Sequence, residues 1–301
     1  MNFANILLGK LSRIKSTLKI KLPVQMRSAL LEFLDSTSKP QKSNALIPPL
    51  KLRHIIGEDH FDTTTSLRQL RVYCGLEPHE KVLDVGCGCG RVAISLVNYL
   101  NATGQYEGFD IIKQFIDWLQ GNITPRYPNF RFQHANVWNT SYNPEGKIVA
   151  SKYKFPYENE SFDVVYLGSV FTHMLPQDLE NYLSEISRVL KPGGRCLISY
   201  FLLTPQTQSR IDQKLSKMDF KDTGKGYSII DEAVPENAVA YPEKYILDLY
   251  QKNHVEVTAP IIRGDWSGIA THQSEGLQDL VIGKKSSRDK TKKTRLQAEK
   301  V

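Results

Sequence analysis

A short apolar run ends at Asp84 and is followed by glycines at alternate positions, in Val82-Leu-Asp-Val-Gly-Cys-Gly-Cys-Gly-Arg91. Glycine permits a tight turn and lets a ligand lie against the backbone, and the start of a following helix offers N–H donors. A dinucleotide site has the pattern G-x-G-x-x-G, with pyrophosphate on these donors. Here the spacing is G-x-G-x-G, and the Asp84 carboxylate would repel pyrophosphate but suit a ligand that carries an ammonium group.

A second acid, Asp110, follows Gly90 by 20 residues and closes the next predicted strand. A carboxylate at this point can accept hydrogen bonds from both hydroxyls of a ribose. An isolated Asp at a strand end is commonly a turn residue, but its place after the glycine loop favours a contact with ribose.

His173 is the candidate general base, in Ser169-Val-Phe-Thr-His-Met174 just beyond a predicted strand. Ligands of open α/β sheets collect at the carboxyl ends of the strands, where this imidazole would lie. The alternative is that His173 only caps or packs. Tyr200 and Asp265 are weaker candidates, on the same geometric argument.

The elements that must position these residues alternate along the chain. Apolar runs that end at glycine or polar residues predict strands, and longer periodic segments predict helices between them. This alternation predicts an α/β fold, a doubly wound parallel sheet with helices on both faces. A polar stretch from 203 to 227 interrupts the pattern. The predicted strands cover 81–86, 106–111, 129–134, 162–167 and 195–202, with edge strands from 255–263 and 277–283, and the predicted helices cover 91–100, 112–120, 179–190 and 242–254.

Four blocks between residues 76 and 203 resemble the class I S-adenosylmethionine-dependent methyltransferases. The acidic glycine-rich loop and the acid after the second strand are the first two. Phe155-Pro-Tyr with Ser161-Phe-Asp-Val-Val165 resembles the approach to the fourth strand, and Arg188-Val-Leu-Lys-Pro-Gly-Gly194 resembles the turn into the fifth. The resemblance implies a Rossmann-like, seven-stranded, mostly parallel sheet whose last strand is antiparallel, and S-adenosylmethionine as the cofactor.

The resemblance also implies which residues hold the cofactor. Asn136 departs from the family, which commonly has an acid there for the adenine amino group, but an amide oxygen can accept the same hydrogen bond. The loop from Asn136 to Phe155 is longer than in compact members and is either a substrate wall or a surface loop without function. The residues assigned to the cofactor are Asp84, Gly86, Cys87, Gly88, Gly90, Asp110, Ile111, Asn136, Val137 and Ser169.

The function that the resemblance implies is methyl transfer to a small-molecule or glycosidic acceptor, at oxygen, by in-line displacement. A sulfonium methyl group is already activated, so positioning and desolvation govern the rate, and a base such as His173 serves an alcohol or a protonated amine. Two alternatives stay open. One is a nicotinamide-dependent oxidoreductase on a Rossmann sheet, which Asp84 and the glycine spacing disfavour. The other is a methyltransferase-like subunit that binds without turnover.

Composition and charge limit the remaining function classes. Of 301 residues, 41% are hydrophobic and 24% charged, and the absence of an apolar run of ~18 residues leads us to expect a cytoplasmic protein. Four cysteines form no disulfide framework, and Cys87-x-Cys89 lacks a second pair of Cys or His nearby, so no metal site is expected. The acidic body shows no nucleic-acid motif, which favours a small-molecule acceptor.

The net charge of +7 is concentrated at the two ends. Eight Lys or Arg against two acids give +6 to residues 1–45 and again to residues 284–301, which leaves −5 for the body. We expect a basic helical arm at 1–45, a methyltransferase domain at 46–283 and a disordered basic tail at 284–301. The arm either packs on its domain or a partner chain, or contacts an anionic membrane together with the tail.

Overall fold

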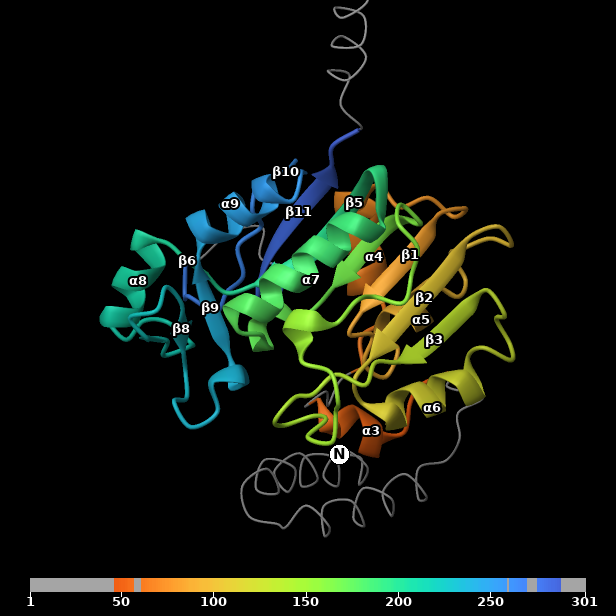
Figure 1. Cartoon of the computed structure of the whole chain (residues 1–301), viewed down its shortest axis with the longest axis horizontal. Coiled ribbons are helices and arrows are strands. Elements are labelled where there is room, and N and C mark those ends of the chain that lie inside the picture. Colours follow the sequence, from red (N-terminus) through yellow and green to blue (C-terminus); the bar gives the residue numbers. More distant parts are fainter. Residues whose placement is uncertain (1–45, 57–60, 259, 270–274, 288–301) are drawn as a thin grey trace, which may run out of the picture. The chain divides into compact units, whose positions relative to one another are not determined.

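The computed structural model describes residues 46–56, 61–258, 260–269 and 275–287 (Figure 1). The predicted arm at 1–45 and the part of the predicted tail after residue 287 lie outside these described residues. Within the described ranges, no helix combines the length and the apolar content needed to cross a membrane.

The chain divides into two compact units, residues 1–61 and 62–301. In the first unit, the described residues contain helix α3 (Leu50–Ile55), in which Leu52 is buried. Every other element below belongs to the second unit.

A seven-stranded sheet forms the centre of the second unit, in the order β10-β11-β5-β4-β1-β2-β3 (Figure 1). The pairs from β5 through β3 are parallel, whereas β11 is antiparallel to both of its neighbours. The predicted mostly parallel sheet with a reversed last strand is therefore confirmed. The strands are β1 (Lys81–Val85), β2 (Gln105–Asp110), β3 (Phe130–His134), β4 (Phe162–Leu167), β5 (Leu190–Tyr200), β10 (Val255–Val257) and β11 (Asp279–Lys285).

Helices cover both faces of this sheet, which explains why its inner strands are nearly continuous apolar runs. Leu83 and Val85 of β1 belong to the same core cluster as residues of α7 and α9, while Figure 1 shows α4 and α5 behind the sheet. The helices are α4 (Thr65–Cys74), α5 (Arg91–Leu96), α6 (Lys113–Asn122), α7 (Pro176–Val189) and α9 (Glu243–Lys252). The parallel register pairs Asp84 with Gly108 and Asp110 with His134, so the polar strand ends lie along one edge of the sheet.

Two strand boundaries differ from the prediction. β5 begins at Leu190 rather than at residue 195, because Leu190 pairs with Phe162 of β4 before a register shift, after which Arg195 pairs with Val164. β11 extends to Lys285, two residues into the predicted tail, where Lys285 Nζ donates to the carbonyl oxygen of Leu190 at 2.8 Å.

The part of the chain between β5 and α9 forms a second, four-stranded sheet. The sequence predicted only a polar stretch followed by a helix in this part of the chain. Its strands have two to four residues, too short to show the alternation that marks a strand. Its small core contains Phe201, Ile211, Phe220 and Trp266, which are far apart in the sequence. The elements are β6 (Leu202–Leu203), α8 (Pro205–Asp212), β7 (Lys221–Asp222), β8 (Ser228–Ile229), η3 (Pro235–Asn237) and β9 (Val239–Pro242), with sheet order β6-β9-β8-β7.

The buried carboxylate of Asp279 joins the two sheets. It accepts hydrogen bonds from the backbone N–H of Leu202 at 2.9 Å, from the backbone N–H of Gly264 at 2.9 Å and from Trp266 Nε1 at 2.8 Å. Three donors compensate for removing the carboxylate from water. The insertion after β5 is thereby attached to β11.

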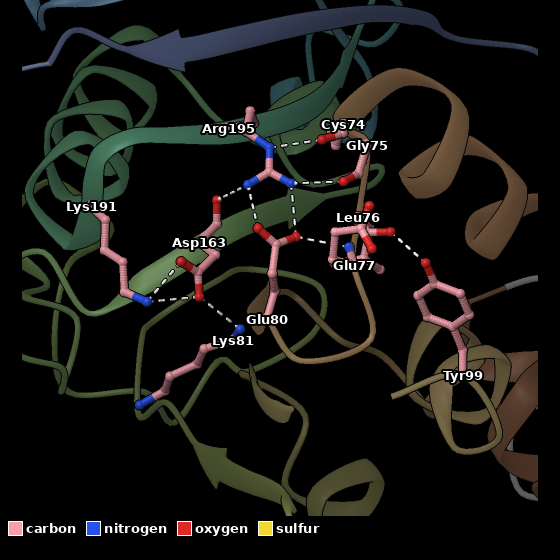
Figure 2. A network of polar contacts seen from close by, with 10 residues as sticks. All are labelled: Cys74, Gly75, Leu76, Glu77, Glu80, Lys81, Tyr99, Asp163, Lys191 and Arg195. Atoms are coloured by element: carbon pink, nitrogen blue, oxygen red, sulfur yellow. Dashed lines mark hydrogen bonds and ion pairs between the residues drawn. The ribbon is translucent and has the colours of Figure 1, made fainter. Parts of the chain in front are cut away.

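A polar network fixes α4 to the amino ends of the central strands, at the edge of the sheet opposite Asp84 and Asp110 (Figure 2). The Arg195 guanidinium holds both carboxylate oxygens of Glu80 at 2.8 Å, and its Nε donates to the carbonyl of Cys74 at the end of α4. Lys191 Nζ donates to both oxygens of the Asp163 carboxylate at 2.7 Å. The same carboxylate also accepts a hydrogen bond from the backbone N–H of Lys81. Burial opposes ionisation of Glu80, but the bonds from Arg195 prevail and lower its pKa.

Candidate active site

The glycine-rich loop after β1 has the left-handed backbone that glycine tolerates best. Gly86, Gly88 and Gly90 have φ values of 75°, 53° and 95°. A Cβ at Gly86 would lie 2.3 Å from Val170 Cγ2, and one at Gly90 would lie 2.4 Å from Leu119 Cδ2. Both conformation and packing therefore require glycine at these two positions.

Asp110 ends β2 beside this loop. Its Oδ2 accepts from the backbone N–H of Gly88 at 2.8 Å, and its Oδ1 accepts from the backbone N–H of Ile112 at 2.9 Å. Burial raises the pKa of Asp110, and these backbone hydrogen bonds partly offset the effect. The structure thus brings together the glycine loop and the acid that were singled out in the sequence.

Asp84 lies within the sheet at the start of the loop and is 1% exposed. Its Oδ2 accepts a hydrogen bond from the Tyr106 hydroxyl at 2.5 Å. Burial raises the pKa of Asp84 to about 7, although the Tyr106 hydrogen bond and the positive charge of Arg91 lower it. The carboxylate has a partner inside the protein, and its contact with an ammonium group stays a prediction.

The cysteines of the loop are buried, and burial raises the pKa of Cys87 well above its ordinary value. A thiol in such surroundings is not a nucleophile at neutral pH. Cys87 packs against Gly108: a Cβ added at Gly108 would lie 3.0 Å from the Cβ of Cys87. Among the described residues, no group of three or more Cys, His, Asp or Glu is arranged to hold a metal ion.

Asn136 and Val137 follow β3, where the sequence predicted contacts with the cofactor. The carbonyl oxygen of Asn136 accepts from the backbone N–H groups of Lys147 and Ile148, both at 3.1 Å. Val137 is 2% exposed, and Ile111 at the end of β2 is partly buried. These residues lie at the same strand edge as Asp110, and their contacts with a cofactor stay predictions.

Ser169 follows β4 with φ of 59°, an uncommon conformation for a residue with a Cβ. Its backbone N–H donates to Ser199 Oγ at 2.8 Å, and its hydroxyl contacts Gln278 Oε1 at 3.0 Å. These residues line a cavity of about 300 Å³ that extends to Arg91 after the glycine loop. Such strain concentrates at functional sites.

Glu275 forms one wall of this cavity and is attached to α4. Its carboxylate forms an ion pair with Arg68 and accepts from the Tyr73 hydroxyl at 2.7 Å. The hydrogen bond from Arg68 lowers the pKa of Glu275. Sequence reasoning missed both Glu275 and Gln278, because neither belongs to a recognisable motif.

His173 lies in the 3₁₀ helix η2 (Phe171–His173) and faces the insertion after β5. Its Nδ1 is 2.9 Å from the carbonyl oxygen of Glu236 in η3. A carbonyl only accepts, so Nδ1 carries the proton and a neutral ring has its lone pair on Nε2. Burial lowers the pKa of His173, against the opposing effect of the backbone of Glu236 and Asn237.

Tyr142, in the long loop between β3 and β4, links His173 to the strand edge. Its ring meets the His173 ring edge to face, with centroids 6.4 Å apart. Burial raises the pKa of Tyr142, and the charge of Asp110 adds to the shift. The ring contact places the loop against His173, and a substrate role of this loop stays a prediction.

Tyr200 and Asp265, the weaker base candidates, have other partners. The Tyr200 hydroxyl is buried and lies 3.1 Å from the Tyr250 hydroxyl. Asp265 forms an exposed ion pair with Lys217. These contacts favour packing and surface roles for the two residues.

Comparison with known sequences finds one family that matches the central part of the chain and several relatives. The family described as a methyltransferase domain matches residues 83–198. The 2-phytyl-1,4-naphtoquinone methyltransferase of Trichormus variabilis is 26% identical over 163 residues, which cover 52% of this chain and 65% of that protein. Phosphoethanolamine N-methyltransferase 3 of Arabidopsis thaliana is 30% identical over 180 residues, or 59% of this chain and 32% of its own length. The chain spans less than two thirds of these relatives.

Among solved structures, the PH0226 protein of Pyrococcus horikoshii has a similar fold. The TM-score is 0.50 at 17% identity, over 82% of this chain and 100% of that one. This likeness concerns the fold alone.

Proposed function

Because the chain carries a class I S-adenosylmethionine-dependent methyltransferase domain, we propose that it transfers the methyl group of S-adenosylmethionine to an oxygen of a small-molecule acceptor, with His173 as general base. The match over residues 83–198 supports the reaction class. The relatives named above act on different acceptors, so the choice of oxygen depends on the residues around His173.

The residues at the strand edge fit the cofactor. The glycine-rich loop lies beside Asp110, whose carboxylate is our candidate for the ribose hydroxyls. Asn136 is our candidate for the adenine amino group, and the polar cavity at Ser169 and Arg91 suits the charged amino-acid end. When bound there, the cofactor supplies a methyl group on a sulfonium, which needs no further activation.

The observation that carries the choice of oxygen is the hydrogen bond between His173 Nδ1 and Glu236. It fixes the tautomer that leaves the Nε2 lone pair available. An acceptor hydroxyl held at Nε2 would give up its proton to the imidazole while its oxygen takes the methyl group; the sulfur–methyl bond would break and S-adenosylhomocysteine would leave. The Glu236 carbonyl would then stabilise the imidazolium through the same hydrogen bond.

The lowered pKa of His173 suits this role, because the ring stays neutral at pH values where an exposed histidine is already protonated. Tyr142 would form the wall against which the acceptor lies, since its ring packs on His173.

The test measures transfer of tritium from methyl-labelled S-adenosylmethionine to fractions of a cell extract depleted of macromolecules. We expect labelled product with the wild-type chain, and about 10²–10⁴-fold slower labelling with His173→Gln at unchanged S-adenosylhomocysteine affinity. The wild-type rate should decline at acid pH, as the imidazole protonates, with its midpoint below the ordinary pKa of histidine, and His173→Gln should lack this decline. Full activity of His173→Gln would leave His173 with a packing role.

A further inference from the structure

The loop between β3 and β4 exposes a cluster of large apolar side chains. Trp138 is 43% exposed, Tyr142 37%, Ile148 39% and Val149 47%. They are four of the nine large hydrophobic residues exposed in the described part of the chain, and they fall within twelve positions. Single exposed apolar residues are ordinary, but such a cluster indicates a surface that binds something. We call residues 138–149 the apolar loop.

Backbone contacts fix the shape of the apolar loop. The N–H of Trp138 donates to the carbonyl of Ile148 at 2.8 Å, and Asn139 pairs with Asn143 to close the tip. Gly146 fits so tightly that a Cβ would lie 2.4 Å from the backbone nitrogen of Trp138. These contacts hold the backbone on both sides of the loop in one conformation.

The charges around the apolar loop favour an anionic lipid surface over a protein partner. Lys147 lies within the loop, and Lys152 and Lys154 follow it; all three are exposed, with Glu145 as the exposed acid of the same stretch. Trp and Tyr beside aliphatic residues and lysines are typical of segments that lie at the membrane interface. Lysine is depleted in protein–protein interfaces, whereas each Lys near an anionic membrane adds attraction.

We propose that the apolar loop inserts Trp138, Ile148 and Val149 into the surface of an anionic bilayer. The loop is continuous with the candidate active site through the contact of Tyr142 with His173. Insertion would hold the entrance of that site at the membrane, where an amphiphilic molecule is available. The membrane contact stands independently of any role of His173 in catalysis.

The fluorescence of Trp138 tests this proposal on the full chain. Trp266 is fully buried and Trp118 partly buried, so subtracting the spectrum of Trp138→Phe isolates the signal of Trp138. The probes are vesicles of phosphatidylcholine and phosphatidylglycerol, with and without bromine on the acyl chains. We expect brominated vesicles to quench the fluorescence of Trp138 at low and at high salt, because salt does not screen the apolar contact of Trp138 with the acyl chains.

A second arm measures partition onto the same vesicles by sedimentation. Ile148→Ser combined with Val149→Ser should weaken partition by about tenfold, because two aliphatic groups no longer leave water. Leu215→Ser, at a position 51% exposed on the insertion, is the matched control and should not change it. Circular dichroism checks that both variants fold.

Three results would overturn the proposal. Vesicle binding without quenching of Trp138 would assign the contact to the basic ends of the chain. No binding at either salt concentration would exclude a bilayer and favour a protein partner. Protection of Trp138 from iodide in the free chain would mean that another segment already covers the loop.

Discussion

The backbone N–H of Gly88 donates a hydrogen bond to Asp110 Oδ2 at 2.8 Å. This contact joins the loop after β1 to the end of β2, and the N–H of Ile112 orients the other carboxylate oxygen. The acid that we assign to the ribose therefore also shapes the glycine loop, so one substitution should affect two parts of the cofactor site.

Replacing Asp110 should weaken the binding of S-adenosylhomocysteine. Loss of two charge-assisted hydrogen bonds in Asp110→Ala should cost roughly 2–4 kcal/mol, or about 30- to 700-fold in affinity. Asp110→Asn keeps one acceptor oxygen and should lose less. Titration calorimetry measures both variants, and circular dichroism checks folding. Equal affinity of wild type and Asp110→Ala would place the sugar elsewhere.

Gly86→Ala should disturb the segment that carries the candidate base. The new Cβ would meet Val170, three residues before His173, in a left-handed conformation that alanine disfavours. Overpacking and backbone strain together should cost about 2–5 kcal/mol in the free energy of unfolding. Gly224→Ala is the control: its φ is 69°, but no atom lies within 4 Å of the new Cβ, so only the strain of ~1–2 kcal/mol applies. Urea denaturation that finds equal losses would refute the packing argument.

Asp84 should make stability depend on pH between about 4 and 7. Below pH 3.8, its carboxyl group is protonated in both the folded and the unfolded chain. As pH rises, the unfolded chain releases the proton first, because burial raises the folded pKa to about 7. This contribution to stability is therefore lost progressively up to pH 7, by about 2–4 kcal/mol. In Asp84→Asn this loss should disappear, as urea denaturation across the pH range can measure. Parallel wild-type and variant curves would contradict the shift.

Arg195→Met should destabilise the chain without weakening cofactor binding, because the network in Figure 2 lies at the amino ends of the strands. Removing the guanidinium leaves the mostly buried Glu80 carboxylate unpaired, which should cost about 2–4 kcal/mol. The exposed pair of Lys113 and Asp117 provides a control, and Lys113→Ala should change stability by less than ~0.5 kcal/mol. A stability loss no larger than in this control would show that the network contributes little.

The central sheet was predictable because each of its strands leaves a local pattern. The acid at Asp84 and the spaced glycines mark the end of β1, and the apolar run 162–167 coincides with β4. The small sheet was not predictable, because two-residue strands such as Ser228–Ile229 leave no periodicity, and Ile229 is buried in a core cluster with residues as distant as Phe171.

The candidate site likewise combines features that the sequence revealed with contacts that it did not. Sequence motifs located Asp110 and His173, but the contact of His173 with Glu236 crosses 63 positions and uses a backbone carbonyl. Every residue has such a carbonyl, so the sequence carries no trace of the contact. Of the contact between Tyr142 and His173, the sequence showed only that the loop is unusually long.

The most direct test of the account is a calorimetric titration of the wild-type chain with S-adenosylhomocysteine and, separately, with NAD⁺. We predict saturable binding of one S-adenosylhomocysteine per chain and no heat from NAD⁺, because Asp84 and the spacing of the glycines do not suit a pyrophosphate. Binding of NAD⁺ in preference to S-adenosylhomocysteine, or no binding of S-adenosylhomocysteine by the folded chain, would contradict the account.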